Sequence, residues 1–170
     1  LNVLILIRSE TRPEIPGDDP GLRLFGNADE FFLQSQPKRG LLTPAEVRCI
    51  ALGMLGLQTN STVWDVGAGS GSFAIEAARL CRDGDVFAIE MDSDDYQLLR
   101  SNADRFQIAN IHPILGEAPQ AWDALPRPDA IFIGGTGRTV SEITFQAFNS
   151  LTDNGRMVVH VAGMSRANEI

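Results

Sequence analysis

Two patterns of apolar residues, short runs and residues at helical spacing, follow one another in turn along this chain. Their alternation predicts strands separated by helices. Short apolar runs fit strands that are buried on both faces, whereas apolar residues that recur every three or four positions fit amphipathic helices. Strands that alternate with helices in this way predict an α/β fold with a doubly wound, mostly parallel sheet. The expected strands are 63–66, 85–90, 111–115, 129–133 and 156–162, and the expected helices between them are 73–82, 94–106 and 140–151.

Capping residues mark where two helices begin. Thr43 can cap a helix whose first residue is Pro44, and Glu46 can complete a capping box with the threonine. Asp92 can cap the helix 94–106. The helix after Thr43 is expected to end at Gly56 and to cover the sheet with the apolar residues Val47, Ile50, Ala51, Met54 and Leu55.

The first 37 residues do not follow this alternation. Residues 1–8 resemble a buried strand with no partner nearby, and Pro, Gly and Asp are frequent over 9–37, as in a linker or an irregular arm. We therefore expect a fragment of a longer protein. In this interpretation 1–8 is the end of a preceding domain, 9–37 is the linker or arm, and 38–170 is the folded domain.

The stretch from Val63 to Ser72 carries the strongest chemical signal. An apolar run contains Asp65, glycines follow at alternate positions over Gly67–Gly71, and a helical pattern then begins. A strand, a tight turn and a helix N-terminus form the usual place where an α/β sheet binds a nucleotide-like cofactor. A dinucleotide fingerprint would need glycine in place of Ser72, and a phosphate-binding P-loop would need Gly-Lys-Ser/Thr.

A second acid supports a cofactor site. Glu90 ends the next expected strand, 23 residues after Gly67, where a carboxylate can accept hydrogen bonds from both ribose hydroxyls. An ordinary turn and a solvated strand-end acid would account for either feature alone. The combination of acid, glycines, helix and second acid favours a bound cofactor.

Composition restricts the class of substrate. The 170 residues include 22 acidic and 14 basic side chains, a formal net charge of −8, whereas binding a polyphosphate needs a positive face.

The apolar run Leu1–Ile7 is too short to span a bilayer, and no signal-peptide layout is present. Cys49 and Cys81 lie among apolar residues and are expected to be buried free thiols. We expect a cytoplasmic protein that acts on a small molecule, without a metal, nucleic acid or membrane partner.

The glycine stretch is similar to the first motif of Rossmann-like S-adenosylmethionine-dependent methyltransferases. With four further motifs in order, residues 37–162 resemble the decarboxylating precorrin C15-methyltransferases of cobalamin (vitamin B12) biosynthesis. That family forms the C-terminal half of the bifunctional precorrin-6Y C5,15-methyltransferases. The motifs are Thr-Pro-Ala-Glu-Val-Arg at 43–48, Trp-Asp-Val-Gly-Ala-Gly-Ser-Gly-Ser at 64–72, Ala-Ile-Glu at 88–90, Gly-Glu-Ala-Pro at 116–119 and Phe-Ile-Gly-Gly-Thr-Gly at 132–137.

The resemblance implies a reaction and an assembly. The reaction is methylation of a precorrin at a meso carbon, C15, with decarboxylation of an acetate side chain and S-adenosyl-L-methionine as cofactor. The assembly is a homo-oligomer, a tetramer, with a preceding tetrapyrrole methylase domain whose closing strand residues 1–5 resemble. Two features depart from the pattern. Residues 159–163 differ from the expected segment, and 163–170 leave the usual edge hairpin absent or truncated.

The resemblance also implies roles for individual residues. Asp65 would orient the ammonium group of the cofactor, Glu90 would bind its ribose, and the backbone of Ala118 would read the adenine edge. Pure helix capping for Thr43 and a simple turn for Ala118 remain alternatives. The full cofactor set is Thr43, Asp65, Gly67, Ala68, Gly69, Ser70, Gly71, Glu90 and Ala118.

The loop after the strand 129–133 indicates the kind of substrate. Enzymes that methylate exocyclic amines usually carry Asn/Asp-Pro-Pro-Tyr/Phe there, whereas this loop is mostly glycine and leaves room for a bulky, flat tetrapyrrole. Arg138 is the first candidate to bind a carboxylate, ahead of Lys38 and Arg39, and Glu117 is either a general acid/base or a solvated turn residue. The expected substrate-binding residues are Gly134, Gly135, Thr136, Gly137 and Arg138, and the expected catalytic residues are Glu117 and Arg138.

Two other functions stay open at this point. A tRNA adenine N1-methyltransferase has a similar cofactor core, but it should also show a basic groove and an additional N-terminal β domain. A non-catalytic cofactor-binding module would bind the cofactor without turnover.

Overall fold

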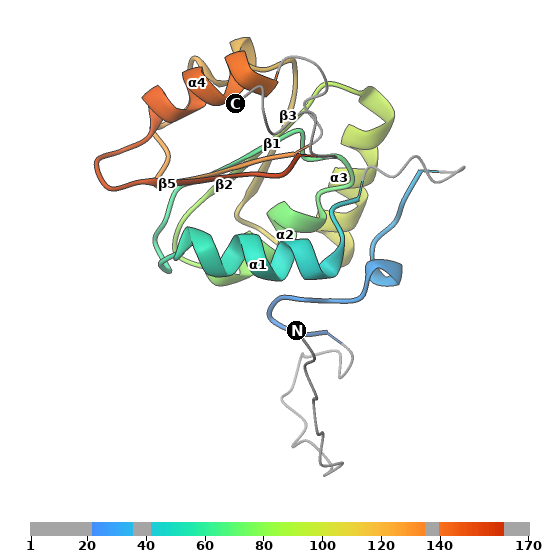
Figure 1. The fold of residues 1–170 in the computed structure, drawn as a ribbon. Helices are drawn as coiled ribbons and strands as arrows, with labels where there is room; N and C mark the ends of the chain where they lie inside the picture. Colours follow the sequence, from blue (N-terminus) through green and yellow to red (C-terminus); the bar gives the residue numbers. More distant parts are fainter. Residues whose placement is uncertain (1–21, 36–41, 135–139, 162–170) are drawn as a thin grey trace.

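The computed structural model describes residues 22–35, 42–134 and 140–161, and within them strands alternate with helices (Figure 1). The strands are β1 Val63–Val66, β2 Val86–Glu90, β3 Ile111–Leu115, β4 Ala130–Ile133 and β5 Arg156–Val159. The helices are α1 Ala45–Leu55, α2 Ser72–Leu80, α3 Ser93–Arg105 and α4 Val140–Ser150, with short 3₁₀ turns η1 Asp29–Phe31 and η2 Gln120–Trp122. The expected elements from 44 onward are confirmed, with small shifts at their ends. The expected strand at 1–8 lies outside the described residues.

The sheet has the strand order β3-β2-β1-β4-β5, and all four neighbouring pairs are parallel. From β1 the chain builds outward through β2 to β3, and it then returns to the other side of β1 to add β4 and β5. The order therefore reverses between β1 and β4, the kind of point at which open α/β sheets bind ligands beyond the carboxyl ends of their strands. The doubly wound α/β fold is confirmed.

Helices cover both faces of the sheet. In Figure 1, α4 lies on one face, and α1, α2 and α3 lie on the other. Phe73 of α2 stacks on Phe132 of β4 with ring centroids 4.0 Å apart, and on the α4 face Trp64 stacks on Trp122 at 5.4 Å. Each face thus has its own apolar core around a stacked aromatic pair.

The ends of α1 and α3 test the expected caps. The Asp92 side chain accepts the N–H groups of Asp94 and Asp95, so the expected cap of α3 is confirmed. The predicted capping box of Thr43 and Glu46 at the start of α1 is wrong, because Pro44 occupies the cap position and no side chain makes a cap hydrogen bond there. Gly56, in the left-handed conformation at φ 62°, ends the helix as expected.

The buried face of α1 differs from the expected one. Ala51 and Leu55 are buried as predicted, but Ile50 and Met54 are 67% and 64% exposed. Arg48, which is not part of the expected apolar face, is fully buried. The helix is rotated toward its arginine because that side chain has charged and polar partners inside the molecule.

Those partners belong to α2 and to residues 22–35, which we call the N-terminal arm. Arg48 forms ion pairs with Glu76 of α2, at 3.2 Å from Nε to Oε2, and with Asp29 of the arm, at 2.8 Å from Nη1 to Oδ1. Asn27 donates its N–H to Glu76 Oε1 at 2.8 Å, and the Asn27 carbonyl accepts from Arg48. Phe32, 3% exposed, inserts into the core beneath the Arg48 guanidinium. The N-terminal arm is irregular in conformation yet packed against the domain.

Both cysteines are free thiols, as predicted. Cys81 is buried, and burial together with the nearby Asp129 charge raises the pKa of its thiol to about 11. Cys49 is only half-buried. Among the described residues, no helix is both long enough and apolar enough to cross a bilayer.

Candidate functional site

The glycine loop, residues 67–71, joins β1 to α2 in a shape that requires glycine. Gly67, Gly69 and Gly71 have positive φ angles of 75°, 54° and 82°, which residues with a Cβ atom rarely adopt. The N–H groups of Gly67 and Ala68 both donate to the Ile89 carbonyl at 3.0 Å. The loop is therefore attached to the carboxyl end of β2, and the N-terminus of α2 follows it directly, with first-turn N–H groups that lack partners within the helix.

Gly71 is required for a second reason, which is space. A Cβ atom at this position would lie 2.2 Å from Cδ1 of Leu99 and 3.4 Å from its Cα. The Gly71 N–H donates to the Ala68 carbonyl at 2.9 Å, and its own carbonyl accepts from Ile75 at 2.9 Å. The chain thus turns into α2 at Gly71, in direct contact with α3.

Glu90 contacts the glycine loop from the end of β2. Its Oε2 accepts the Gly69 N–H at 2.8 Å, and its Oε1 accepts the Asp92 N–H at 2.8 Å. Glu90 as a whole is only 7% exposed. Because a carboxylate offers about four acceptor positions, Glu90 can hold the loop and still accept hydroxyl groups of a ligand.

Asp65 is buried beneath the same loop. It alternates along β1 with Trp64 and Val66, so it points to the face covered by α1, α2 and α3. Within the described part of the chain, neither carboxylate oxygen makes a hydrogen bond. Desolvation first, and then the Glu90 charge, raises the pKa of Asp65 to about 8, an effect that the Ala74 backbone N–H, which lies outside hydrogen-bond geometry, offsets only in part. Asp65 is therefore a buried carboxyl group whose ionised form a cationic ligand group would favour.

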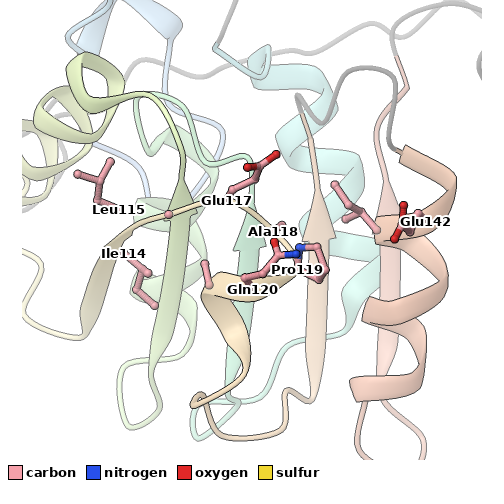
Figure 2. A pocket seen from close by; sticks show the side chains of 10 residues that line it. Ile114, Leu115, Glu117, Ala118, Pro119, Gln120 and Glu142 are labelled. Carbon is pink, nitrogen blue, oxygen red and sulfur yellow. The ribbon is translucent and has the colours of Figure 1, made fainter.

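An open pocket of about 550 Å3 lies between the end of β3 and the start of α4 (Figure 2). Glu117, after β3, and Glu142, in the first turn of α4, stand on opposite sides of it. Ala118 and Ile143 add apolar surface to the pocket lining. The other lining residues are Ile114, Leu115, Gly116, Pro119, Gln120 and Ala121.

The expected substrate loop begins beside the glycine loop. The Gly134 N–H donates to the Val66 carbonyl at 2.9 Å, and a Cβ atom on Gly134 would lie 3.2 Å from Cε1 of Phe132. Gly134 therefore lies at the switch point between β1 and β4. Gly135, Thr136, Gly137 and Arg138 lie outside the described residues, as do Lys38 and Arg39.

Thr43 is held by α1 and not by the glycine loop. Its carbonyl accepts a hydrogen bond from Nη1 of Arg48, and among the described residues no hydrogen bond joins it to the loop. The structure thus brings Asp65, Glu90 and the glycine loop together, and it places Glu117 and Ala118 in the pocket between β3 and α4.

Two residues of the site were missed by sequence reasoning. Glu142 lines the pocket, and its only signal was its position as an acid in the first turn of the helix that follows the substrate loop. Asn102 is fully buried in α3 and donates to the Ser70 carbonyl at 2.9 Å. A polar residue at a buried position of an amphipathic helix was the available signal.

Comparison with known proteins identifies the family. A family profile described as "Precorrin methyltransferase domain" matches residues 36–169. A probable cobalt-precorrin-6B C(15)-methyltransferase (decarboxylating) of Sulfurisphaera tokodaii is 35% identical over 150 residues, which cover 87% of this chain and 77% of the relative. A precorrin-6Y C(5,15)-methyltransferase [decarboxylating] of a Sinorhizobium species is 35% identical over 121 residues, 71% of this chain and 29% of the relative.

A solved structure agrees with the sequence relatives. The crystal structure of a precorrin-6y C5,15-methyltransferase from Geobacter metallireducens superimposes with a TM-score of 0.81 at 33% identity, covering 86% of this chain and 77% of that chain. The resemblance seen in the motifs is therefore confirmed, and this chain belongs to the precorrin methyltransferase family of Rossmann-like methyltransferases.

Proposed function

We propose that this protein transfers a methyl group from S-adenosyl-L-methionine to the meso carbon C15 of a precorrin and releases carbon dioxide from an acetate side chain. The observation that carries the proposal is the match of residues 36–169 to the family profile. That match includes the glycine loop, Glu90 and the pocket beside Ala118. The printed names of the relatives, which include decarboxylating C15-methyltransferases, supply the reaction.

The donor and acceptor groups around the glycine loop fit this cofactor. Its ammonium group and ribose hydroxyls are hydrogen-bond donors, and the loop region offers acceptors. Asp65 has two buried oxygens that make no hydrogen bond to the described residues. The buried hydroxyl of Ser70 also makes no hydrogen bond to them. Glu90 retains acceptor capacity at the loop. We assign the ammonium group to Asp65, the ribose to Glu90 and the adenine edge to the backbone of Ala118, with Thr43 as a further contact.

The loop that begins at Gly134 and the pocket of Figure 2 would receive the substrate. A loop with few side chains leaves space for a flat macrocycle, and Arg138 would bind one of its carboxylates as a charge-assisted pair. Orientation of the nucleophilic carbon near the methyl group matters more here than a strong base, because the macrocycle is already electron-rich. The cofactor, when bound, supplies an electrophilic methyl group on a sulfonium centre.

The decarboxylation step needs a proton as well as a binding site. The bond between the acetate methylene and its carboxylate breaks, its electron pair enters the macrocycle, and carbon dioxide leaves. A proton then adds to the methylene carbon to form a methyl group. Glu117 is the candidate acid for this step because it borders the pocket at the end of β3.

The proposal extends to partners and location. The Sinorhizobium relative is several times longer than the segment it shares with this chain, which supports a tetrapyrrole methylase domain in the same polypeptide. The family resemblance supports our proposal of a homotetramer, and the free thiols support our proposal of a cytoplasmic location. A net charge of −8 disfavours a nucleic-acid substrate.

The direct test is the mass of the product. Purified protein is incubated with precorrin-6B, in cobalt-free and cobalt-containing forms, and with methyl-labelled S-adenosylmethionine. Mass spectrometry should find one labelled methyl group gained and one carbon dioxide lost. Methylation of tRNA in a parallel incubation would favour the adenine N1-methyltransferase alternative. Cofactor binding without turnover on either precorrin would favour the non-catalytic module.

A further inference from the structure

One buried amide connects the glycine loop to the N-terminal arm. Asn102 of α3 is fully buried, and both ends of its side chain are used. Its Oδ1 accepts the Leu33 N–H at 2.8 Å, and its Nδ2 donates to the Leu33 carbonyl at 3.0 Å and to the Ser70 carbonyl at 2.9 Å. Leu33 is 69 residues away along the chain, and Ser70 is 32 residues away.

The contact with Ser70 complements that of Glu90. Glu90 binds the N–H of Gly69 from the sheet, while Asn102 binds the next residue's carbonyl from the helix. Leu99, one turn before Asn102, fills the space above Gly71. Three consecutive loop residues are thus held by three different side chains. Because α3 alone, among the described residues, holds the Ser70 carbonyl, the position of Asn102 determines how the loop peptide is oriented.

We propose that Asn102 is a positioning residue for the cofactor, which sets the orientation of the glycine loop and couples it to the N-terminal arm. Loss of its amide would leave three backbone groups without their partner, the part-buried N–H and carbonyl of Leu33 and the buried carbonyl of Ser70, and the cost should be largest for the buried Ser70 carbonyl. The inference rests on the proposed S-adenosylmethionine site. By linkage, whatever stabilises the arm at Leu33 also stabilises the loop that binds the cofactor.

Asn110 provides a matched control. Its Nδ2 also donates to three backbone carbonyls, those of Ala78, Cys81 and Gly84, at 2.8–3.2 Å. These contacts lie before β2 and β3, at the opposite end of the sheet from the glycine loop. Removing either amide should therefore lower stability, but only Asn102 should affect cofactor binding.

The experiment compares Asn102→Ala and Asn110→Ala by urea unfolding and by calorimetric titration with S-adenosylhomocysteine. We expect lower unfolding midpoints for both variants, and a dissociation constant raised about tenfold for Asn102→Ala alone. Asn102→Asp keeps the acceptor for the Leu33 N–H but loses both donors, and it should weaken binding as well. A dissociation constant within about twofold of the wild type for Asn102→Ala, or an equal loss in Asn110→Ala, would overturn the proposal.

A measurement on the unmodified protein covers the case in which Asn102→Ala does not fold. Hydrogen exchange is followed with and without S-adenosylhomocysteine. Binding should slow exchange at the Leu33 amide in the arm as well as in the glycine loop. Slowing in the loop alone would refute the coupling. If the wild-type protein binds no S-adenosylhomocysteine at all, the proposed cofactor site itself fails, which distinguishes that outcome from a failure of Asn102.

Discussion

The Glu90 carboxylate accepts the backbone N–H of Gly69 at 2.8 Å. The acid that ends β2 therefore holds the loop that follows β1, and both elements lie at the carboxyl edge of neighbouring parallel strands. This contact makes the shape of the glycine loop dependent on Glu90 before any ligand arrives.

Replacement of Glu90 should weaken cofactor binding. Glu90→Ala removes acceptors from the loop and from the proposed ribose contact, and it should cost roughly 1–3 kcal/mol of S-adenosylhomocysteine binding free energy in calorimetry. Asp83→Ala, exposed just before the same strand, should leave the affinity unchanged. Equal affinity of Glu90→Ala and the wild type would remove Glu90 from the site.

Asp65 should make stability depend on pH. Its pKa is raised from 3.8 to about 8 in the folded protein, so the folded state binds more protons than the unfolded state between these values. The free energy of unfolding should therefore fall as the pH rises through that window, by at most about 1.4 kcal/mol per pH unit. Asp65→Asn cannot ionise, and its unfolding free energy should change less between pH 5 and 8 in urea titrations.

The control for this pH effect is Asp153→Asn, because Asp153 is exposed. Its stability profile should run parallel to that of the wild-type protein. A profile for Asp65→Asn as steep as that of the wild type would show that another group titrates in this window.

Two glycines should respond oppositely to alanine. At Gly71 the new Cβ atom would collide with Leu99 and would require φ near 82°, which should cost roughly 2–5 kcal/mol of unfolding free energy. At Gly53, in the middle of α1, nothing lies within 4 Å of the new atom, and alanine should stabilise by about 0.5–1 kcal/mol. Thermal and urea unfolding measure both, and a tolerated Gly71→Ala would contradict the packing of α3 on the loop.

Arg48 should be essential for the packing of the N-terminal arm. Arg48→Met leaves the fully buried Glu76 and the Asn27 carbonyl without their cationic partner, and breaking a buried ion pair typically costs about 3–5 kcal/mol. Limited proteolysis should then cut within residues 22–35 faster than in the wild type. Arg100→Met, at an exposed arginine of α3, should change neither stability nor cleavage.

Arg138 should affect substrate binding more than chemistry. If its guanidinium binds a precorrin carboxylate equally in the ground and transition states, Arg138→Ala should raise KM and leave kcat almost unchanged. A large fall in kcat with unchanged KM for Arg138→Ala would instead assign the arginine to the chemical step.

A valine in place of Gly135 should block binding of the macrocycle, while calorimetry should still detect cofactor binding.

The sequence alone determined the order of elements and the place of the cofactor loop. The apolar runs at 63–66 and 129–133 match β1 and β4, whose residues are all buried, because a strand buried on both faces needs only local apolar character. The glycine loop and Glu90 were recognisable because a tight turn requires glycine and because consecutive parallel strands end at the same edge. These signals depend on neighbours in the chain or on the regular geometry of the sheet.

Only the tertiary structure decided which polar residues are buried. Arg48 and Asn102 are of polar residue types that usually face solvent, yet both lie on the buried faces of their helices and are fully buried. Their partners, Glu76 and Leu33, are 28 and 69 residues away. A buried polar group is stable only when its partner is present. The burial of these residues, the rotated face of α1 and the packing of the N-terminal arm therefore depend on contacts that no local pattern contains.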